Sequence, residues 1–476
     1  MKQFPDDFIW GAATSAYQIE GGYNSDGKGP SIWDAFTSIP DKIYQGQTGN
    51  TACNHYQLFR EDVALMAAMN LPAYRFSISW PRILPTGYGR VNGAGIEFYN
   101  RLINALLEKD ITPWITLYHW DLPLALQFEK DGWLNPKIVS YFTEYAAICF
   151  AHFGDRVKNW ITINEPWVAA MLGYGQRVFA PGRTSNVEPY VAGHHLLRAH
   201  AAAVELYRTR FQPTQKGRIG ISNNCDWREP VSVKKKDVDA AQRSLLFYLG
   251  WFADPIYLGD YPDVMRQRLG ERLPRFTDKE KEKLKESSDF FGLNQYTTLL
   301  AGHADGPIPD NYIFSNGGIP EDQDVILSQD DSWAQTEMQW HIVPWGCRKL
   351  LEWIHARYNG PCIILTENGC AFEDQIEDGF VNDAKRVNFL KSYISACHRA
   401  IQNGVNLGGY FVWSLMDNFE WTFGFSKRFG IHYVDFKTQK RTPKASARWY
   451  TDVIRNNGLI DESYSQKKAL ARKKRS

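Results

Sequence analysis

The sequence lacks both an excess of charge and a long apolar run. Its 476 residues include 54 Lys and Arg against 53 Asp and Glu, which leaves a net charge of +1. A chain with so little net charge does not attract a polyanion in bulk, which disfavours a nucleic-acid binder. No segment approaches the roughly 20 uninterrupted apolar residues of a membrane-spanning helix. We therefore expect neither nucleic acid nor a membrane as a partner.

Cysteine is also scarce, and the cysteines do not cluster. The seven Cys residues form no C-x-x-C pair, so we expect reduced thiols packed as small apolar side chains. Residues 1–7 contain no apolar segment typical of a secretory signal, and no Asn-x-Ser/Thr sequence occurs. These absences predict a cytoplasmic location.

The charge is unevenly distributed along the chain. Residues 467–476 hold six basic side chains and no acidic one, so the rest of the chain carries a net charge of −5. A run of like charge at a chain end is typical of a solvated tail. We interpret residues 458–476 as a basic C-terminal tail that is disordered at its end, with an anchoring or targeting arm as the alternative.

What is present is an alternation of short apolar runs with longer segments of helical spacing. The apolar runs lie at residues 8–14, 73–79, 111–118, 158–164, 218–223, 289–294, 361–367 and 408–414. Helical spacing is found at residues 58–69, 96–107, 138–153, 189–211 and 387–401, with later helices near 237–249, 345–358 and 443–456. Buried parallel strands are near-continuous apolar runs, and eight such strands close a barrel.

We therefore predict an α/β fold, a single (β/α)8 TIM barrel over residues 1–457 with long βα loops. A doubly wound open sheet is the alternative, but no strand is followed by the Gly-rich loop of a nucleotide-binding sheet. Residues 302–344, rich in Gly, Pro, Asp and Asn, form a long irregular segment. In a barrel this segment is a βα loop, on the face where active sites are built.

Two of the predicted strands end in a single carboxylate. Glu165 ends the fourth run and precedes Pro166, and Glu367 ends the seventh run shortly before Gly369. Glycoside cleavage requires two carboxylates that face one pocket, one to protonate the leaving oxygen and one to attack or to activate water. Either Glu alone could instead cap a helix or pair with a basic residue. Both together, at matching strand ends, favour glycoside chemistry.

Residue types that bind sugars gather at other strand ends. Arg75 lies in an otherwise apolar strand, where it needs a carboxylate partner and would keep Glu367 ionised. His119, Asn294 and the segment 413–421 follow the third, sixth and eighth runs. Aromatic residues make up 14% of the chain, with 17 Trp, and their flat rings can stack on sugars or fill a large core.

These motifs, in this order, resemble glycoside hydrolase family 1, the retaining β-glucosidases. The resemblance runs from F-I-W-G-A-A-T-S-A-Y-Q-I-E-G at residues 8–21 to R-F-G-I at residues 428–431. It implies a (β/α)8 barrel that removes terminal β-D-glucosyl, and also galactosyl or fucosyl, residues from β-glucosides and cello-oligosaccharides. Retention through a covalent glycosyl-enzyme is implied as well. The implied partner is a small-molecule glycoside, with no cofactor and no metal, and the oligomeric state stays open.

The resemblance also implies roles for individual residues. Glu165 matches the acid/base and Glu367 the nucleophile, and Arg75, Tyr296 and Asn294 match residues that orient the nucleophile. The residues that match sugar-binding positions are Gln18, His119, Asn164, Trp413, Glu420, Trp421, Trp340 and Phe429. Asn224, or Asn223 beside it, matches one further position.

The sequence departs from the family pattern near the predicted aglycone region. Gln295 stands where a second Tyr is frequent, and His341, Trp345 and Gln176-Arg177 are unusual types there. Three alternative functions follow from related patterns. A 6-phospho-β-glycosidase resembles a pattern with Ser in place of Glu420, whereas this chain has Glu420. A sugar-binding pseudoenzyme lacks one catalytic Glu, and a thioglucosidase has Gln at the acid position, whereas this chain has both Glu165 and Glu367.

Overall fold

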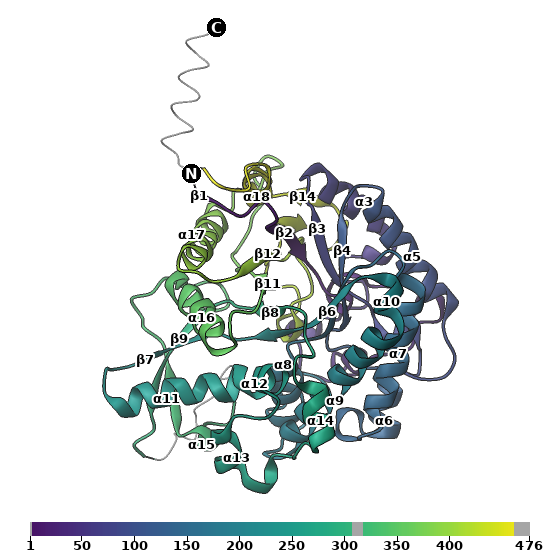
Figure 1. The fold of residues 1–476 in the computed structure, drawn as a ribbon. Coiled ribbons are helices and arrows are strands. Elements are labelled where there is room, and N and C mark those ends of the chain that lie inside the picture. The colour runs from purple at the N-terminus through teal and green to yellow at the C-terminus, as the bar shows by residue number, and fades with distance from the viewer. Residues whose placement is uncertain (1, 307–317, 461–476) are drawn as a thin grey trace, which may run out of the picture.

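The computed structural model describes residues 2–306 and 318–460, and its centre is a closed barrel of eight parallel strands (Figure 1). Around the barrel the strands follow the order β11-β12-β2-β3-β4-β5-β6-β8. Their bounds are β2 Ile9–Ala13, β3 Ala73–Ser77, β4 Thr112–Tyr118, β5 Asn159–Asn164, β6 Arg218–Asn224, β8 Phe291–Asn294, β11 Ile363–Asn368 and β12 Leu407–Trp413. Each strand overlaps one predicted apolar run, so the predicted (β/α)8 barrel is confirmed.

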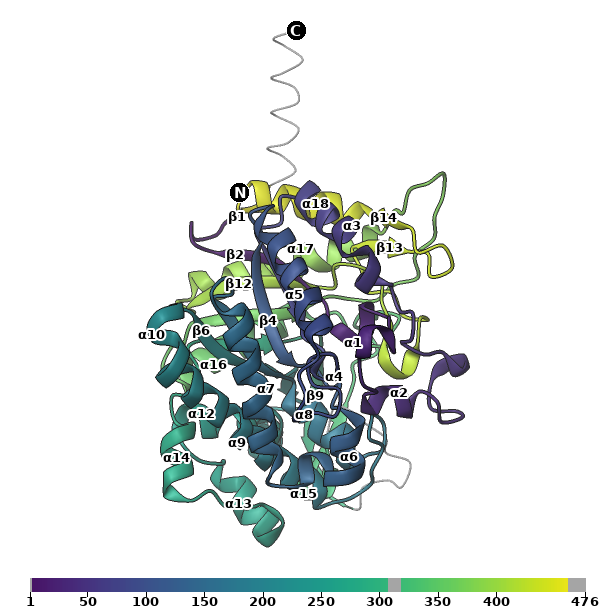
Figure 2. The same cartoon turned by 90° about the vertical axis from the view of Figure 1, so that its right-hand side faces the viewer.

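Helices surround the barrel on its outer face (Figures 1 and 2). In α5 the residues Ile96, Tyr99, Ile103 and Leu106 recur at three- and four-residue spacing and are buried, as expected of a helix with one apolar face. The longer helices are α3 His55–Ala68, α5 Gly93–Leu107, α7 Ile138–Phe153, α9 Glu188–Leu206, α11 Lys235–Leu245, α12 Trp251–Leu258, α16 Pro344–Arg357, α17 Ala384–Gln402 and α18 Ala445–Arg455. The shorter ones are α1 Ala16–Ile19, α2 Ile32–Phe36, α4 Trp80–Ile83, α6 Leu124–Lys130, α8 Pro166–Ala170, α10 Gln212–Gln215, α13 Asp263–Leu269, α14 Asp278–Leu284 and α15 Pro320–Gln323.

Two predicted helices lie where expected, but the last turn of each is a π-helix instead of an α-helix. The helix predicted at 189–211 is α9 followed by one π-helical turn, Tyr207–Phe211. The helix predicted at 237–249 is α11 followed by another π turn, Leu246–Gly250. Apolar spacing does not distinguish a π turn from an α turn over five residues, so the sequence could not indicate this change.

Aromatic side chains fill the interior of the barrel. The Trp114 ring is 1% exposed and packs edge to face on Phe290 and Phe411, with ring centroids 5.5 and 5.2 Å away. Gly11 on β2 lies against the same Phe411 ring, and a Cβ there would stand 2.3 Å from a ring carbon. The cluster continues to Trp413 at the end of β12, so the core supports the residues at the mouth of the barrel.

The segment 302–344, predicted to be irregular, is partly ordered. It contains the end of β9 (Thr298–His303), helix α15 and strand β10 (Val325–Ser328), while residues 307–317 lie outside the described residues. Strand β9 pairs with β10 on one side and with β7 (Trp227–Pro230) on the other, in a small sheet beside the barrel. The partner β7 belongs to an earlier βα loop, and so distant a pairing leaves no local pattern in the sequence.

The two ends of the described chain pair with each other. Strand β1 (Lys2–Gln3) is antiparallel to β15 (Gly458–Leu459), so ordered structure extends two residues beyond the predicted boundary at 457. The rest of the predicted disordered tail, residues 461–476, lies outside the described residues. A further pair, β13 (His432–Val434) and β14 (Arg441–Pro443), precedes α18. Over the described ranges, no helix has the length and apolar composition needed to cross a bilayer.

Replacement of Trp114 by Ala tests the role of the aromatic interior. We expect W114A to lower the free energy of unfolding by about 3–5 kcal/mol, because it opens a large cavity in a closed barrel. Equilibrium denaturation by guanidinium chloride measures the change. Phe128, which is 78% exposed on α6, provides the control, since F128A should change stability by less than about 0.5 kcal/mol. Equal effects of the two substitutions would contradict the packing described here.

Candidate active site

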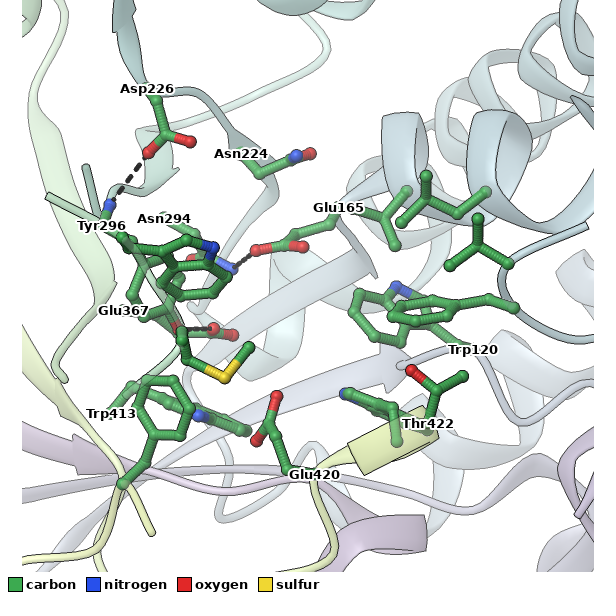
Figure 3. Close-up of a pocket in the computed structure, with 18 of the residues that line it drawn as sticks. Trp120, Glu165, Asn224, Asp226, Asn294, Tyr296, Glu367, Trp413, Glu420 and Thr422 are labelled. Atoms are coloured by element: carbon green, nitrogen blue, oxygen red, sulfur yellow. Dashed lines mark hydrogen bonds between the residues drawn. The ribbon is translucent and has the colours of Figure 1, made fainter. Parts of the chain in front are cut away.

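Side chains at the carboxyl ends of the barrel strands surround one cavity of about 270 Å³ (Figure 3). Glu165 follows β5, Glu367 lies in β11, and Trp413 ends β12. The predicted site residues that line this cavity are His119, Glu165, Asn294, Tyr296, Trp340, Glu367, Trp413, Glu420, Trp421 and Phe429. The barrel therefore brings together residues that are as much as 310 positions apart.

Glu367 is held by a cation and a phenol. Arg75 Nη1 donates to Glu367 Oε1 at 2.5 Å. The Tyr296 hydroxyl donates to Glu367 Oε2 at 2.6 Å (Figure 3). Burial raises the pKa of Glu367, while the charge of Arg75 and the hydrogen bond from Tyr296 oppose that rise. These two donors favour the ionised carboxylate.

Glu165 has the opposite electrostatic environment. It accepts one hydrogen bond, from Asn294 Nδ2 to Oε1 at 2.7 Å. Burial and then the neighbouring charge of Glu367 raise its pKa well above the ordinary value, so the protonated form is favoured. Its backbone has φ 46° at the N-terminus of α8, a left-handed conformation that costs about 1–3 kcal/mol in a residue other than Gly. The fold thus sustains local strain to present this carboxyl group.

Arg75 connects the strand ends that carry the two carboxylates. Its guanidinium is fully buried and also donates from Nη2 to Asn164 Oδ1 at 2.6 Å and from Nη1 to the Thr366 carbonyl at 3.1 Å. Asn164 precedes Glu165, and Thr366 precedes Glu367. One rigid, planar cation therefore fixes the ends of β5 and β11 relative to each other.

The same network determines the hydrogen-bonding state of His119. Arg75 and Asn294 both donate to Asn164 Oδ1, so the Asn164 amide directs its Nδ2 to His119 Nε2, 3.1 Å away. Burial and the charge of Arg75 hold the pKa of His119 well below its usual range. The neutral ring then carries its proton on Nδ1, which is buried without a hydrogen-bond partner among the described residues. A ligand hydroxyl group would satisfy this donor.

Polar and aromatic groups form the remaining walls. Gln18 Nε2 lies 3.4 Å from Glu420 Oε2 and also donates to Asn418 Oδ1 at 3.0 Å. Burial, followed by the charge of Glu367, raises the pKa of Glu420 to about 8. Trp340 packs on Tyr296 and Phe429, with ring centroids 5.2 and 6.0 Å away. Flat rings and paired polar groups around one cavity are suited to a hydroxyl-rich ring.

Comparison with known proteins agrees with this geometry. The family profile described as Glycosyl hydrolase family 1 matches residues 1–459. The chain belongs to this family. It is 49% identical to β-glucosidase 42 of Arabidopsis thaliana over 467 residues, which cover 96% of this chain and 95% of the relative.

Solved structures of other family 1 proteins have the same fold. A Thermotoga maritima family 1 glycoside hydrolase, solved with a cyclophellitol analogue as a transition-state mimic, superimposes with a TM-score of 0.90 at 46% identity. That alignment covers 96% of this chain and 99% of the other. A variant of a rice β-glucosidase, solved in a covalent complex with glucose, also gives 0.90, at 43% identity, with 94% of this chain and 98% of the other covered.

Three of the predicted residues are not among the residues that line the cavity. Gln18, Arg75 and Asn164 are buried and contact the lining residues through the hydrogen bonds described above. Of the two adjacent Asn residues, Asn224 lines the cavity. The residues of unusual type that stand outside the described lining are Gln295, His341, Trp345, Gln176 and Arg177.

Several lining residues were not predicted from the sequence of this family 1 chain. They are Trp120, Val168, Leu172, Val178, Phe179, Cys225, Asp226, Tyr248, Met338, Thr422 and Phe423. Trp120 could have been found, since it lies next to His119 at a strand end. The others lie in loops or on neighbouring helices, where apolar and polar residues give no signal of the cavity. Within the described ranges, no group of His, Cys, Asp or Glu is arranged to hold a metal ion.

Glu420 makes stability depend on pH. Its pKa is about 8 in the folded chain against an ordinary 4.5, so between these values the folded state retains a proton that the unfolded state has lost. The free energy of unfolding therefore falls as the pH rises through this interval. We expect E420Q to unfold with the same free energy as the wild type near pH 4, and to be more stable at pH 8 by an amount on the order of a few kcal/mol.

Denaturation curves at pH 4, 6 and 8 measure this difference. The control is E282Q, at an exposed carboxylate in α14, which should change the free energy of unfolding by less than about 0.5 kcal/mol. A constant difference for E420Q would show that burial does not govern the ionisation of Glu420.

Proposed function

We propose that this chain is a retaining β-glucosidase that removes terminal β-D-glucosyl residues through a covalent glycosyl-enzyme. The observation that carries the proposal is the unequal environment of two neighbouring carboxyl groups. Arg75 and Tyr296 favour ionised Glu367, whereas burial and the charge of Glu367 favour protonated Glu165. The names of the curated relatives and the covalent glucose complex of the rice enzyme support the same activity.

In the first step, the Glu367 carboxylate attacks the anomeric carbon. As the bond from that carbon to the leaving oxygen breaks, Glu165 gives its proton to this oxygen, and the aglycone departs as an alcohol. Glu367 is now a neutral ester, so the charge that raised the pKa of Glu165 is gone.

In the second step, Glu165 acts as the base. Its carboxylate takes a proton from water, the water oxygen attacks the anomeric carbon, and the ester bond to Glu367 breaks. Two displacements at the same carbon release glucose with the original configuration, and both carboxyl groups return to their starting states.

The sugar ring is held by groups on the side of Glu420. The free Nδ1 proton of His119 donates to one sugar hydroxyl group, and Gln18 and Glu420 bind others. Trp413 provides the aromatic floor, and Trp421 and Asn164 complete the binding set, while Trp340 and Phe429 contact the aglycone. Galactosyl and fucosyl residues can use most of these contacts.

The alternative functions are less consistent with these residues. Among the described residues that line the cavity there is no Lys or Arg to bind the phosphate of a 6-phosphoglycoside. A pseudoenzyme would not retain both carboxylates with opposite preferences for the proton. Cellulose degradation through cello-oligosaccharides and a cytoplasmic location remain predictions of the sequence.

The products formed with azide test the two assigned roles. In E367G, hydrolysis of p-nitrophenyl β-glucoside should fall below detection, and azide should restore turnover with an α-glucosyl azide as product, because one displacement inverts the configuration. In E165A, azide should instead give the β-glucosyl azide, since it intercepts the glycosyl-enzyme on Glu367. NMR of the anomeric proton distinguishes the products. Undiminished hydrolysis by E367G, or the same azide from both variants, would contradict the assignments.

Replacement of Tyr296 by Phe tests the role of the phenol. Without its hydrogen bond to Glu367 Oε2, the pKa of Glu367 should rise, because that bond favours the ionised form. We expect the acidic limb of the kcat/KM profile of Y296F to move to higher pH, with a roughly tenfold loss at the optimum. An acidic limb identical to that of the wild type would show that the phenol does not influence the ionisation of Glu367.

A further inference from the structure

A carboxylate outside the proposed catalytic pair also lines the cavity. Asp226 lies between β6 and β7, is 6% exposed and faces the cavity beside Asn224 (Figure 3). Burial of a carboxylate is unfavourable unless its charge is compensated by neighbouring groups, and buried carboxylates with such partners are frequent at functional sites.

Asp226 Oδ1 binds the backbone of the segment that follows β8. It accepts a hydrogen bond from the peptide N–H of Tyr296 at 3.1 Å (Figure 3). It also accepts one from the peptide N–H of Thr297 at 2.9 Å. Next to it, the Cys225 N–H donates to the Asn294 carbonyl at 3.0 Å. On the other side, the Tyr393 hydroxyl donates to the Tyr296 carbonyl at 3.1 Å. The peptide that carries the Tyr296 phenol is thus fixed at both its N–H and its C=O.

The charge of Asp226 also reaches the cavity. The groups around it are Arg228 on β7, Cys225 beside it, Tyr248 in the π turn, Tyr393 on α17 and Glu165. Burial raises the pKa of Asp226, whereas Arg228 and the two peptide N–H groups favour its ionised form. When ionised, Asp226 raises the pKa of Glu165, in addition to burial and the charge of Glu367.

We propose that Asp226 is a positioning residue for both carboxyl groups of the pair: it fixes Tyr296 against Glu367 and places an additional negative charge near Glu165. This inference rests on the proposed function. Asp226 makes two separate contributions, one through its hydrogen bonds and one through its charge. The hydrogen bonds of Oδ1 set the geometry of the phenol, and the net charge disfavours loss of the Glu165 proton.

Two substitutions separate the geometric contribution from the charge. In D226N, the amide oxygen can still accept both peptide N–H groups, but the charge is gone. We expect near wild-type kcat at the optimum and an alkaline limb of kcat/KM at lower pH, because the pKa of Glu165 falls. In D226A, both contributions are gone. Here the same alkaline shift should be joined by an acidic limb at higher pH and a kcat/KM lower by about tenfold or more, since Tyr296 is no longer fixed.

The matched control is E229Q, which removes a negative charge from β7 where Glu229 pairs with Lys349. The acidic and alkaline limbs of its kcat/KM profile should lie at the same pH as those of the wild type. An unshifted alkaline limb in D226N would overturn the electrostatic part of the proposal, and an equal loss of kcat in D226N and D226A would overturn the positioning part. D226N tests the charge even if D226A does not fold. Failure of either part leaves the azide products of E367G and E165A unchanged, so it is distinguishable from failure of the proposed function.

Discussion

The ion pair between Arg75 and Glu367 is the interaction on which the site depends. Both side chains are buried at the mouth of the barrel, where an unpaired charge is strongly unfavourable and removal of one partner leaves the other uncompensated. The guanidinium has five donors in one plane, and it uses them on Glu367, Asn164, the Thr366 carbonyl and Thr116. Through Asn164, the pair also determines which nitrogen of His119 carries the proton. The ionisation of one carboxylate and the hydrogen bonding of the sugar pocket therefore have a common origin.

The barrel, and two carboxylates at its strand ends that face one cavity, could be predicted from the sequence for a physical reason. A strand buried on both faces has to be apolar along its length, so an apolar run is visible without knowledge of its partners. A polar residue at the end of such a run then stands out, as Glu165 and Glu367 do. The sequence could not predict the β7-β9-β10 sheet, because its strands come from different βα loops. Nor could it predict Asp226, since a carboxylate in a connecting segment is ordinary until the fold brings the Tyr296 peptide against it.

The carboxyl groups around the cavity differ in their surroundings and therefore in their preference for the proton. Four carboxyl groups, Glu165, Glu367, Glu420 and Asp226, line the cavity. Arg75 and Tyr296 distinguish Glu367 from the others, whereas burial and the charge of Glu367 raise the pKa of both Glu165 and Glu420. The raised pKa values of the buried carboxyl groups lower the free energy of unfolding at neutral pH, and the left-handed backbone of Glu165 lowers it as well. The aromatic interior around Trp114 provides the favourable burial that offsets these two effects.

The pairing of β1 with β15 has a consequence for engineering. Asn457 accepts a hydrogen bond from Trp10 at the start of β2, so the two ends meet at the amino-terminal rim of the barrel, away from the strand ends that carry the cavity. In a chain cut back to residues 2–459, a short peptide linker between these two residues would close a ring, and new termini could then be opened in a surface loop. For the same reason, a fusion partner or an immobilising support attached directly at residue 2 or residue 459 of such a chain leaves the entrance to the cavity accessible.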